Sequence, residues 1–416
     1  MSSTHDNESL KVQARGRIEF TDDDADVKQL SPGGYLIIEK TTGGVLSRER
    51  SRFEAREQNG SITRKYSVND KTLSDEEGRA WLKTFLPEFV RETGISADRR
   101  VARFLARGGP DAVLADITQT RSGYAKSTYM KELFKQTTLD AATLGKALRQ
   151  AGREIASDYD SSQVLMAASE LQPIDSAMPA FVEASRNIDS DYDARNVFTR
   201  ALGRPSMTAA LASQIFKAAT PGAGNAGISS DYDLAEVLIA TPPALIAQDA
   251  SGWSGAVNSI QSSYDRRRVI SSVIRPGVAP EVADQALKAA AGIESDYDLA
   301  EVLVDVVKDG GLTDRTAPSF FAAMPQIGSD YDHRRVLQAV AQATVTDGAL
   351  AQATATTSGM SSDYDRAESL VAISHSKAVG PSTRKALAEA VNGIGSEHDR
   401  GRVLSALTRA GVLTAR

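Results

Sequence analysis

A polar tetrad, Ser-Asp-Tyr-Asp, recurs through most of the chain and is the feature best suited to carry chemistry. Two carboxylates spaced two residues apart, beside a serine hydroxyl, supply the oxygen ligands that calcium prefers. The same residue types also begin helices, because serine at the N-cap accepts from the N3 amide and carboxylates in the first turn favour the helix dipole. No glycine-rich twelve-residue loop surrounds the tetrads. They are therefore interpreted as helix starts, and no metal or cofactor is expected.

The copies of the tetrad are spaced as structural repeats. Most neighbouring copies are 32 to 35 residues apart, with one step of 40, and self-similarity at such a period predicts a solenoid. Three copies depart from the consensus and begin at Ser122, Ser262 and Ser396. In the other six copies we assign repeat capping to Ser157, Asp160, Ser190, Asp193, Ser230, Asp233, Ser295, Asp298, Ser329, Asp332, Ser362 and Asp365.

Each repeat is expected to contain two antiparallel helices. The serine is placed at the N-cap, and the second aspartate, at N3, is expected to reach back to the N-cap amide and complete a capping box. An apolar residue two positions before the serine, such as Ile293, is placed as a hydrophobic staple. The predicted fold class is therefore mainly α: a HEAT-like α-solenoid of about eight helical hairpins with a period of about 33 residues.

Two side-chain patterns suggest how neighbouring repeats contact one another. The tetrad tyrosines are predicted to wedge between hairpins, with each hydroxyl bound to a polar partner; they are Tyr159, Tyr192, Tyr232, Tyr264, Tyr297, Tyr331 and Tyr364. Three residues after the second aspartate, the charge alternates along the later repeats. This alternation predicts an inter-repeat ladder, although coincidence on a solvated face would give the same pattern. The ladder residues are Glu236, Arg268, Glu301, Arg335, Glu368 and Arg402.

The N-terminal part of the chain has a different pattern. Residues 1–15 are polar and predict a disordered tail. Residues 16–70 alternate in hydrophobicity and contain Asn59-Gly60, which predicts an antiparallel β-meander of about four strands. Residues 71–121 predict a helical connector that begins at a capping box, Ser74 to Glu77. The α-solenoid repeats are assigned to residues 122–416.

Composition and motifs argue against several classes of function. The chain has no cysteine, and its four histidines form no zinc-binding motif. His333 is expected on an exposed helix face. Neither a nucleophile elbow nor a glycine-rich phosphate loop is present, so we expect no enzyme and name no catalytic residue. With no stretch of 18 apolar residues and no signal peptide, the expectation is a cytoplasmic protein without a membrane span.

Two basic patterns could contact a partner. Arg48, Arg50, Arg52 and Arg56 share one face of a predicted strand, which suggests an acidic partner or simply the wet face of a one-sided sheet. A second group suggests a basic stripe for nucleic acid, although the chain has a formal net charge of −6 and acidic residues interrupt the stripe. This group consists of Arg266, Arg267, Arg268, Arg334, Arg335, Arg400 and Arg402.

The repeat pattern I-x-S-D-Y-D-x-x-x-V-L, together with the preceding segment from SPGGYLIIEK to GGPDAVLADI, resembles a family of bacterial proteins. It is similar to the region C-terminal to the peptidase in membrane zinc peptidases of the β-lactam-sensor type, over about residues 16–416. The peptidase itself has no counterpart here, so the resemblance implies a bacterial regulatory or sensory module without catalytic residues.

The sequence leaves three functions open. The first is a non-catalytic scaffold that binds a protein or peptide along an elongated surface. The second is a sensory module that binds a small ligand or a cell-envelope component through the β domain. The third is a helical-repeat nucleic-acid binder, which the acidic composition disfavours.

Overall fold

The computed structural model describes residues 2–5, 8–43, 48–222, 227–275 and 277–412. It confirms a mainly helical chain with an antiparallel sheet at its N-terminus. The residues form two compact units, Met1–Asn187 and Ile188–Arg416. We call the first the N-terminal unit and the second the C-terminal unit.

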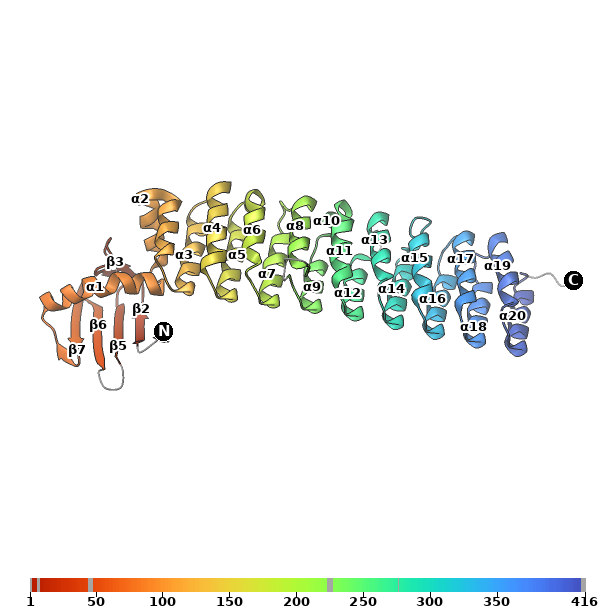
Figure 1. Ribbon diagram of the computed structural model, residues 1–416, viewed down its shortest axis with the longest axis horizontal. Helices are drawn as coiled ribbons and strands as arrows, with labels where there is room; N and C mark the ends of the chain where they lie inside the picture. Colours follow the sequence, from red (N-terminus) through yellow and green to blue (C-terminus); the bar gives the residue numbers. More distant parts are fainter. Residues whose placement is uncertain (1, 6–7, 44–47, 223–226, 276, 413–416) are drawn as a thin grey trace. The chain divides into compact units, whose positions relative to one another are not determined.

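The N-terminal unit begins with a six-stranded antiparallel sheet, in which each strand pairs with its neighbours in the order β1-β2-β5-β6-β7-β8 (Figure 1). A separate ribbon pairs β3 with β4. Asn59 and Gly60 connect β6 to β7 with positive φ angles of 53° and 81°, which confirms the predicted hairpin turn. The strands are β1 (Ser2–His5), β2 (Glu8–Arg15), β3 (Ile18–Phe20), β4 (Val27–Leu30), β5 (Tyr35–Thr42), β6 (Glu49–Gln58), β7 (Ser61–Val68) and β8 (Lys71–Thr72).

The predicted disordered tail over residues 1–15 is wrong for residues 2–5 and 8–15, which form strands; residues 1, 6 and 7 lie outside the described residues. Strand β2 pairs with β5 along its whole length, and β1 pairs with β2. Leu10 and Val12 pack against the hydrophobic core, whereas Lys11 is exposed on the opposite face. The segment is polar overall because one face of the strand is exposed to solvent. On the other face, two apolar side chains are enough to pack it against the core.

One face of the sheet is covered by α1 (Asp75–Thr93). Ser74 and Glu77 form the predicted capping box at the start of this helix. Leu82, Leu86 and Phe89 of α1 lie in the same buried cluster as the sheet residues Ile38 and Phe53.

A buried ion network joins the ribbon to α2 (Ala97–Thr118), which is broken at Gly108 and Gly109. Arg100, only 6% exposed, hydrogen bonds to Asp24 in the β3–β4 loop and to both carboxylate oxygens of Asp116, at 2.9 and 2.7 Å. Arg103 also pairs with Asp24.

The first two helical hairpins belong to the N-terminal unit, so the contacts do not divide the chain at residue 122. Helix α3 packs on α1 and α2, and the hydroxyl of its buried Tyr129 donates to the carbonyl oxygens of Val90 and Arg91 at 2.8 and 3.0 Å. The elements of these hairpins are α3 (Gly123–Gln136), α4 (Ala141–Glu154), α5 (Asp158–Leu171), η1 (Ile174–Ala177) and α6 (Met178–Ser185).

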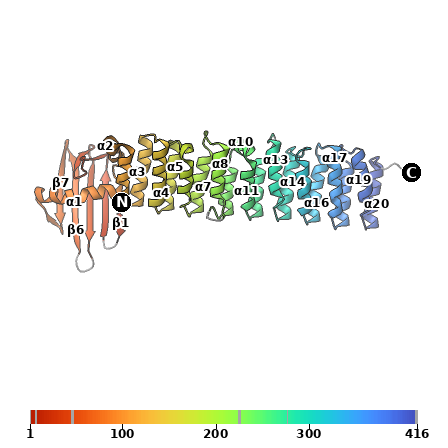
Figure 2. The ribbon, with the colours of Figure 1, turned by 45° about the horizontal axis from the view of Figure 1, so that its top comes forward.

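The C-terminal unit contains six hairpins followed by one helix among its described residues. The tetrad helices form one row and the return helices form the other (Figures 1 and 2). Each tetrad helix contacts the tetrad helix of the next repeat. The tetrad helices are α7 (Asp191–Leu202), α9 (Asp231–Ile239), α12 (Ser263–Val273), α14 (Asp296–Lys308), α16 (Asp330–Gln342), α18 (Asp363–Ser374) and α20 (Glu397–Arg409).

The return row is less uniform. One repeat has two short return helices, and two others end in a 3-10 turn. Between the rows, the staple isoleucines and Val-Leu pairs are buried, as at Ile293, Val302 and Leu303. The return elements are α8 (Ala209–Ala219), α10 (Pro243–Gln248), α11 (Ala250–Ser259), α13 (Pro280–Ala290), α15 (Ala317–Ala323), η2 (Met324–Gln326), α17 (Asp347–Thr356), η3 (Thr357–Gly359) and α19 (Pro381–Val391).

Candidate binding surface

The tetrad serines cap their helices as the sequence predicts. In the repeat that begins at Ser295, the serine Oγ accepts from the backbone N–H of Asp298 at 3.2 Å. This contact satisfies one of the amides that have no partner within the helix. The same contact is made by Ser157, Ser190, Ser230, Ser262, Ser329, Ser362 and Ser396.

The capping boxes predicted for the tetrads are replaced by a bond between repeats. The carboxylate of Asp330 accepts from the backbone N–H groups of Ser361 and Ser362, at the start of the next tetrad helix. Asp363 holds Gly395 and Ser396 in the same way. The first aspartate of a tetrad therefore caps the following helix. Sequence reasoning missed this role because it depends on how successive helices stack.

We expect Ser263→Asp to raise the free energy of unfolding by about 0.5–1 kcal/mol, because a hydrogen bond is gained across the repeat junction. In the natural chain, Ser263 Oγ accepts a single bond from the amide of Ser295, at 3.2 Å. A carboxylate there would bind two amides, as Asp330 does. Denaturant unfolding measures the change. The reciprocal Asp330→Ser should lower stability by a similar amount, and equal stabilities for all three proteins would contradict the capping role.

The tetrad tyrosines do not wedge between hairpins. All seven are exposed, by 52% to 64% of their surface, so the prediction that they wedge between hairpins is wrong. At N2, the ring projects outward from the first helical turn. The positions that face the core are filled instead by the residue two after the tyrosine and by the Val-Leu pair, as at Leu299, Val302 and Leu303. The exposed tyrosines are Tyr159, Tyr192, Tyr232, Tyr264, Tyr297, Tyr331 and Tyr364.

In the C-terminal unit, arginines lie beside these rings. The guanidinium carbon of Arg195 is 4.6 Å from the ring centroid of Tyr192 and 5.9 Å from that of Tyr232. Arg267, Arg268 and Arg334 likewise each lie between two tyrosines, whereas Arg335 and Arg402 lie over one. We call these six arginines and Tyr192, Tyr232, Tyr264, Tyr297, Tyr331 and Tyr364 the tyrosine–arginine ridge.

The predicted charge ladder is present as three separate ion pairs. Arg268 bonds to Glu236, Arg335 to Glu301, and Arg402 to Glu368. These bonds raise the pKa of each arginine.

At the intervening junctions another arginine reaches forward to the second aspartate of the next tetrad. Arg267 lies 3.1 Å from Asp298, and Arg334 lies 2.8 Å from Asp365. Because stacked and ion-paired side chains lose less freedom on binding, the ridge is a pre-organised surface.

The ridge also carries hydrogen-bonding capacity that the described part of the chain does not use. Within that part, the hydroxyls of the ridge tyrosines make no hydrogen bond, although the rings are held by arginine. Tyr159, in the N-terminal unit, is 64% exposed, and no guanidinium of a described residue lies over its ring. It therefore provides a matched exposed tyrosine outside the ridge.

Six of the seven arginines of the suggested basic stripe are engaged by other groups of the protein. Arg266 is 8% exposed and donates to the carbonyl oxygens of Ile260, Asn258 and Gly292. The ridge arginines are paired with carboxylates, so they present little uncompensated charge to a phosphate backbone.

His333 is buried, so the expected exposed position is wrong. Its side chain occupies the place of Leu234 and Leu299 in other repeats, and its Nε2 lies 3.1 Å from Thr356 Oγ1. Burial lowers the pKa of His333 below its ordinary value of 6.5.

We expect the free energy of unfolding to fall as the pH drops below about 6.5, by up to about 1.4 kcal/mol per pH unit. The reason is that His333 then becomes protonated in the unfolded chain but stays neutral in the folded protein, where it is buried. Urea unfolding of the natural protein and of His333→Leu, between pH 7.5 and 5, isolates this contribution. The leucine variant should lose less stability on acidification. Parallel pH profiles for the two proteins would show that His333 titrates as an ordinary exposed histidine.

The basic strand in the N-terminal unit lies on the open face of the sheet. Arg52 pairs with Glu39 and, at 3.0 Å, with Glu54, and Arg56 pairs with Glu54. Arg50 lies 3.8 Å from Glu39. Arg48 is exposed. The structure thus places Arg50, Arg52 and Arg56 on a solvated face where acidic neighbours balance them, whereas Arg48 lies just before β6 and not on the strand as predicted.

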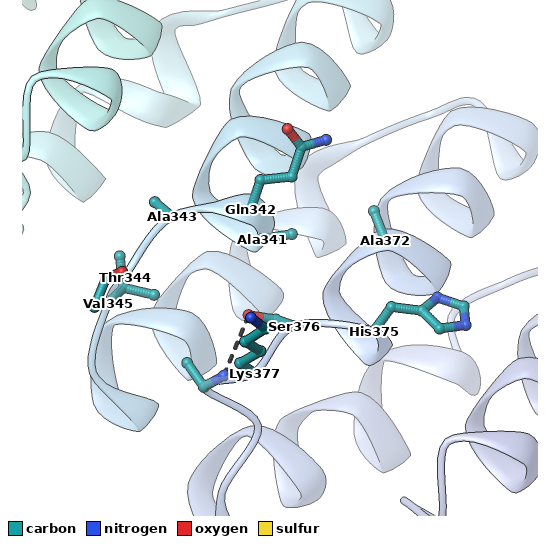
Figure 3. Close-up of a pocket in the computed structure, with 10 residues that line it drawn as sticks. Ala341, Gln342, Ala343, Thr344, Val345, Ala372, His375, Ser376 and Lys377 are labelled. Atoms are coloured by element: carbon teal, nitrogen blue, oxygen red, sulfur yellow. Dashed lines mark hydrogen bonds between the residues drawn. The ribbon is translucent and has the colours of Figure 1, made fainter.

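A depression near the C-terminal ends of α16 and α18 offers little chemistry (Figure 3). Alanines and short polar residues line most of it, and its two ionisable side chains are His375 and Lys377. The His375 ring bonds to the carbonyl oxygen of Val371, in its own helix, at 2.8 Å. The lining therefore lacks a nucleophile held by a base.

The fold and the ridge define a helical-repeat protein of the α-solenoid class. No protein-family model matches the chain, and no curated protein matches its sequence. Among the described helices, none is long and apolar enough to cross a membrane. Among the described residues, no cluster of three or more histidine or acidic side chains could hold a metal ion.

Proposed function

We propose that this chain is a non-catalytic scaffold that binds a protein or peptide along the tyrosine–arginine ridge. The observation that carries the proposal is the distribution of exposed large apolar side chains. Of the ten in the described residues, eight are tyrosines of the repeats, and six of these belong to the ridge. Tyrosine and arginine are the residue types, with tryptophan, that contribute most to binding at protein interfaces.

The internal energetics of the fold do not require these rings to be tyrosine. A surface cation–π contact stabilises the folded protein by about 0.5–1 kcal/mol. A long aliphatic side chain in place of the tyrosine could partly replace this contribution by packing against the arginine. Exposed aromatic rings held in fixed positions do, however, contribute contact area to a partner at low entropic cost. The repetition along successive helices favours a partner that makes several similar contacts.

The experiment compares capture of partners from a cell lysate by the natural chain and by a Tyr264→Ala, Tyr297→Ala, Tyr331→Ala variant. We expect the variant to lose at least one specific partner that Tyr159→Ala retains. With that partner purified, the loss of affinity should exceed about 2 kcal/mol, as for an interface hot spot. Equal capture by all three proteins, with circular dichroism confirming that each is folded, would refute the proposal.

A further inference from the structure

We propose that the ridge binds an extended polypeptide in the polyproline II conformation that carries basic residues. This inference rests on the proposed function and specifies the kind of partner. It draws on three independent properties of the ridge: the spacing of its rings, the state of their hydroxyls and the charge around them.

The spacing of the rings fits a polypeptide with a period of three residues. Because Arg334 lies 5.1 Å from the centroid of Tyr331 and 5.5 Å from that of Tyr364, the two centroids are separated by no more than the sum of these distances. This limit is roughly 11 Å, a little above the usual distance of about 8–10 Å between packed helices. A polyproline II helix advances about 9 Å in one turn of three residues, so every third residue can meet the next tyrosine.

The hydroxyls favour a partner whose backbone acceptors are not already engaged. Those of Tyr264, Tyr297 and Tyr331 make no hydrogen bond within the described residues, and their rings are more than half exposed. A polyproline II helix has no internal hydrogen bonds, so its carbonyl oxygens can accept from such a row of donors. An α-helix repeats at a comparable distance over two turns, but its carbonyl oxygens are mostly bonded within the helix. Recognition of proline-rich segments by aromatic side chains uses this pre-formed geometry.

The charge around the rings favours a basic partner. The seven tetrads of the C-terminal unit, each taken with the three residues after it, contain 16 acidic and nine basic residues, a formal net charge of −7. The ridge arginines are already engaged by acidic side chains of this set, as Arg267 is by Asp298 and Arg335 by Glu301. Lysine or arginine beside the prolines would meet a complementary potential, which increases the association rate and favours one partner over another.

The experiment measures binding of fluorescein-labelled (Pro-Pro-Arg)n peptides, with n from three to six, by fluorescence anisotropy at physiological ionic strength. We expect affinity to increase with n, since each added triplet reaches one more tyrosine. A (Gly-Gly-Arg)n series has the same charge and length but lacks the stiff conformation, and it should bind at least tenfold more weakly. A helical peptide of equal charge should also bind more weakly.

The tyrosine hydroxyls are tested with Tyr264→Phe, Tyr297→Phe, Tyr331→Phe, which keeps the rings. This triple variant should bind (Pro-Pro-Arg)6 at least tenfold more weakly, whereas Tyr159→Phe should bind as the natural chain does. Equal binding of the glycine series, tighter binding of the helical peptide, or no binding of any peptide would each overturn the inference. If lysate capture still depends on the ridge, the scaffold proposal stands while this choice of partner fails.

Discussion

Arg100→Met is expected to lower the free energy of unfolding of the N-terminal unit by about 3–5 kcal/mol, because it leaves buried carboxylates without their counter-charge. Arg100 bonds to Asp24 and Asp116, and both carboxylates are largely buried, at 5% and 11% side-chain exposure. Methionine fills much of the volume of the arginine stem, so the change tests the lost charge more than lost packing. Arg103, which also bonds to Asp24, can compensate for part of the loss.

Hydrogen exchange of the amides of α2 gives a local measure of this change. We expect their protection to fall by the stated free energy relative to the natural chain. Arg99→Met is the matched control, because Arg99 is on the same helix but 48% exposed, 3.8 Å from Asp98. It should alter protection by less than about 1 kcal/mol, as is usual for surface ion pairs. A similar small effect for Arg100→Met would mean that water or neighbouring groups satisfy the carboxylates.

We expect Trp253→Ala to lower the free energy of unfolding by about 3–5 kcal/mol, because it opens a cavity in the core of a repeat whose short helices can only partly collapse into it. Trp253 is fully buried in α11, and its Nε1 donates to the carbonyl oxygen of Leu238 at 3.5 Å. Helix α11 contacts α8, α9, α10 and α13, so the ring lies where several short elements meet.

Because each repeat of a solenoid contacts mainly its neighbours, the destabilisation should be concentrated near the substitution. Hydrogen exchange resolved by segment should show the largest loss of protection in α8 to α13 and a smaller loss in α20. Trp253→Phe should cost less than Trp253→Ala, since it leaves a smaller cavity. Uniform loss of protection across the C-terminal unit would instead show that it unfolds as one cooperative block.

The parts of this architecture that could be predicted from sequence are those that depend on local rules. The period, the N-cap serines and the buried isoleucines follow from residues within a few positions of each other, and the structure confirms them. The charge alternation also identified three true ion pairs, because residues at equal positions in successive repeats meet.

The predictions that failed concern residues whose surroundings are set by parts of the chain that are distant in sequence. Tyrosine is usually buried in part, so its place on the outside of every first turn was not evident from the residue type. The first aspartate of a tetrad has its hydrogen-bond partners more than 30 residues away, as Asp330 has Ser361 and Ser362. Strand β2 was missed because it has few apolar residues. Its backbone is held in place by pairing with β5, which cannot be read from the sequence of β2 itself.

The alternation of acidic and basic repeats constrains how this array can change in length. Glu236, Glu301 and Glu368 each stand one repeat before an arginine that binds them. Loss or duplication of a single repeat would bring two glutamates, or two arginines, to one junction. Loss or duplication of two consecutive repeats would restore opposite charges at every junction. Among these repeats the charge pattern therefore has a period of two hairpins, and removal of two consecutive hairpins should preserve the ion pairs better than removal of one.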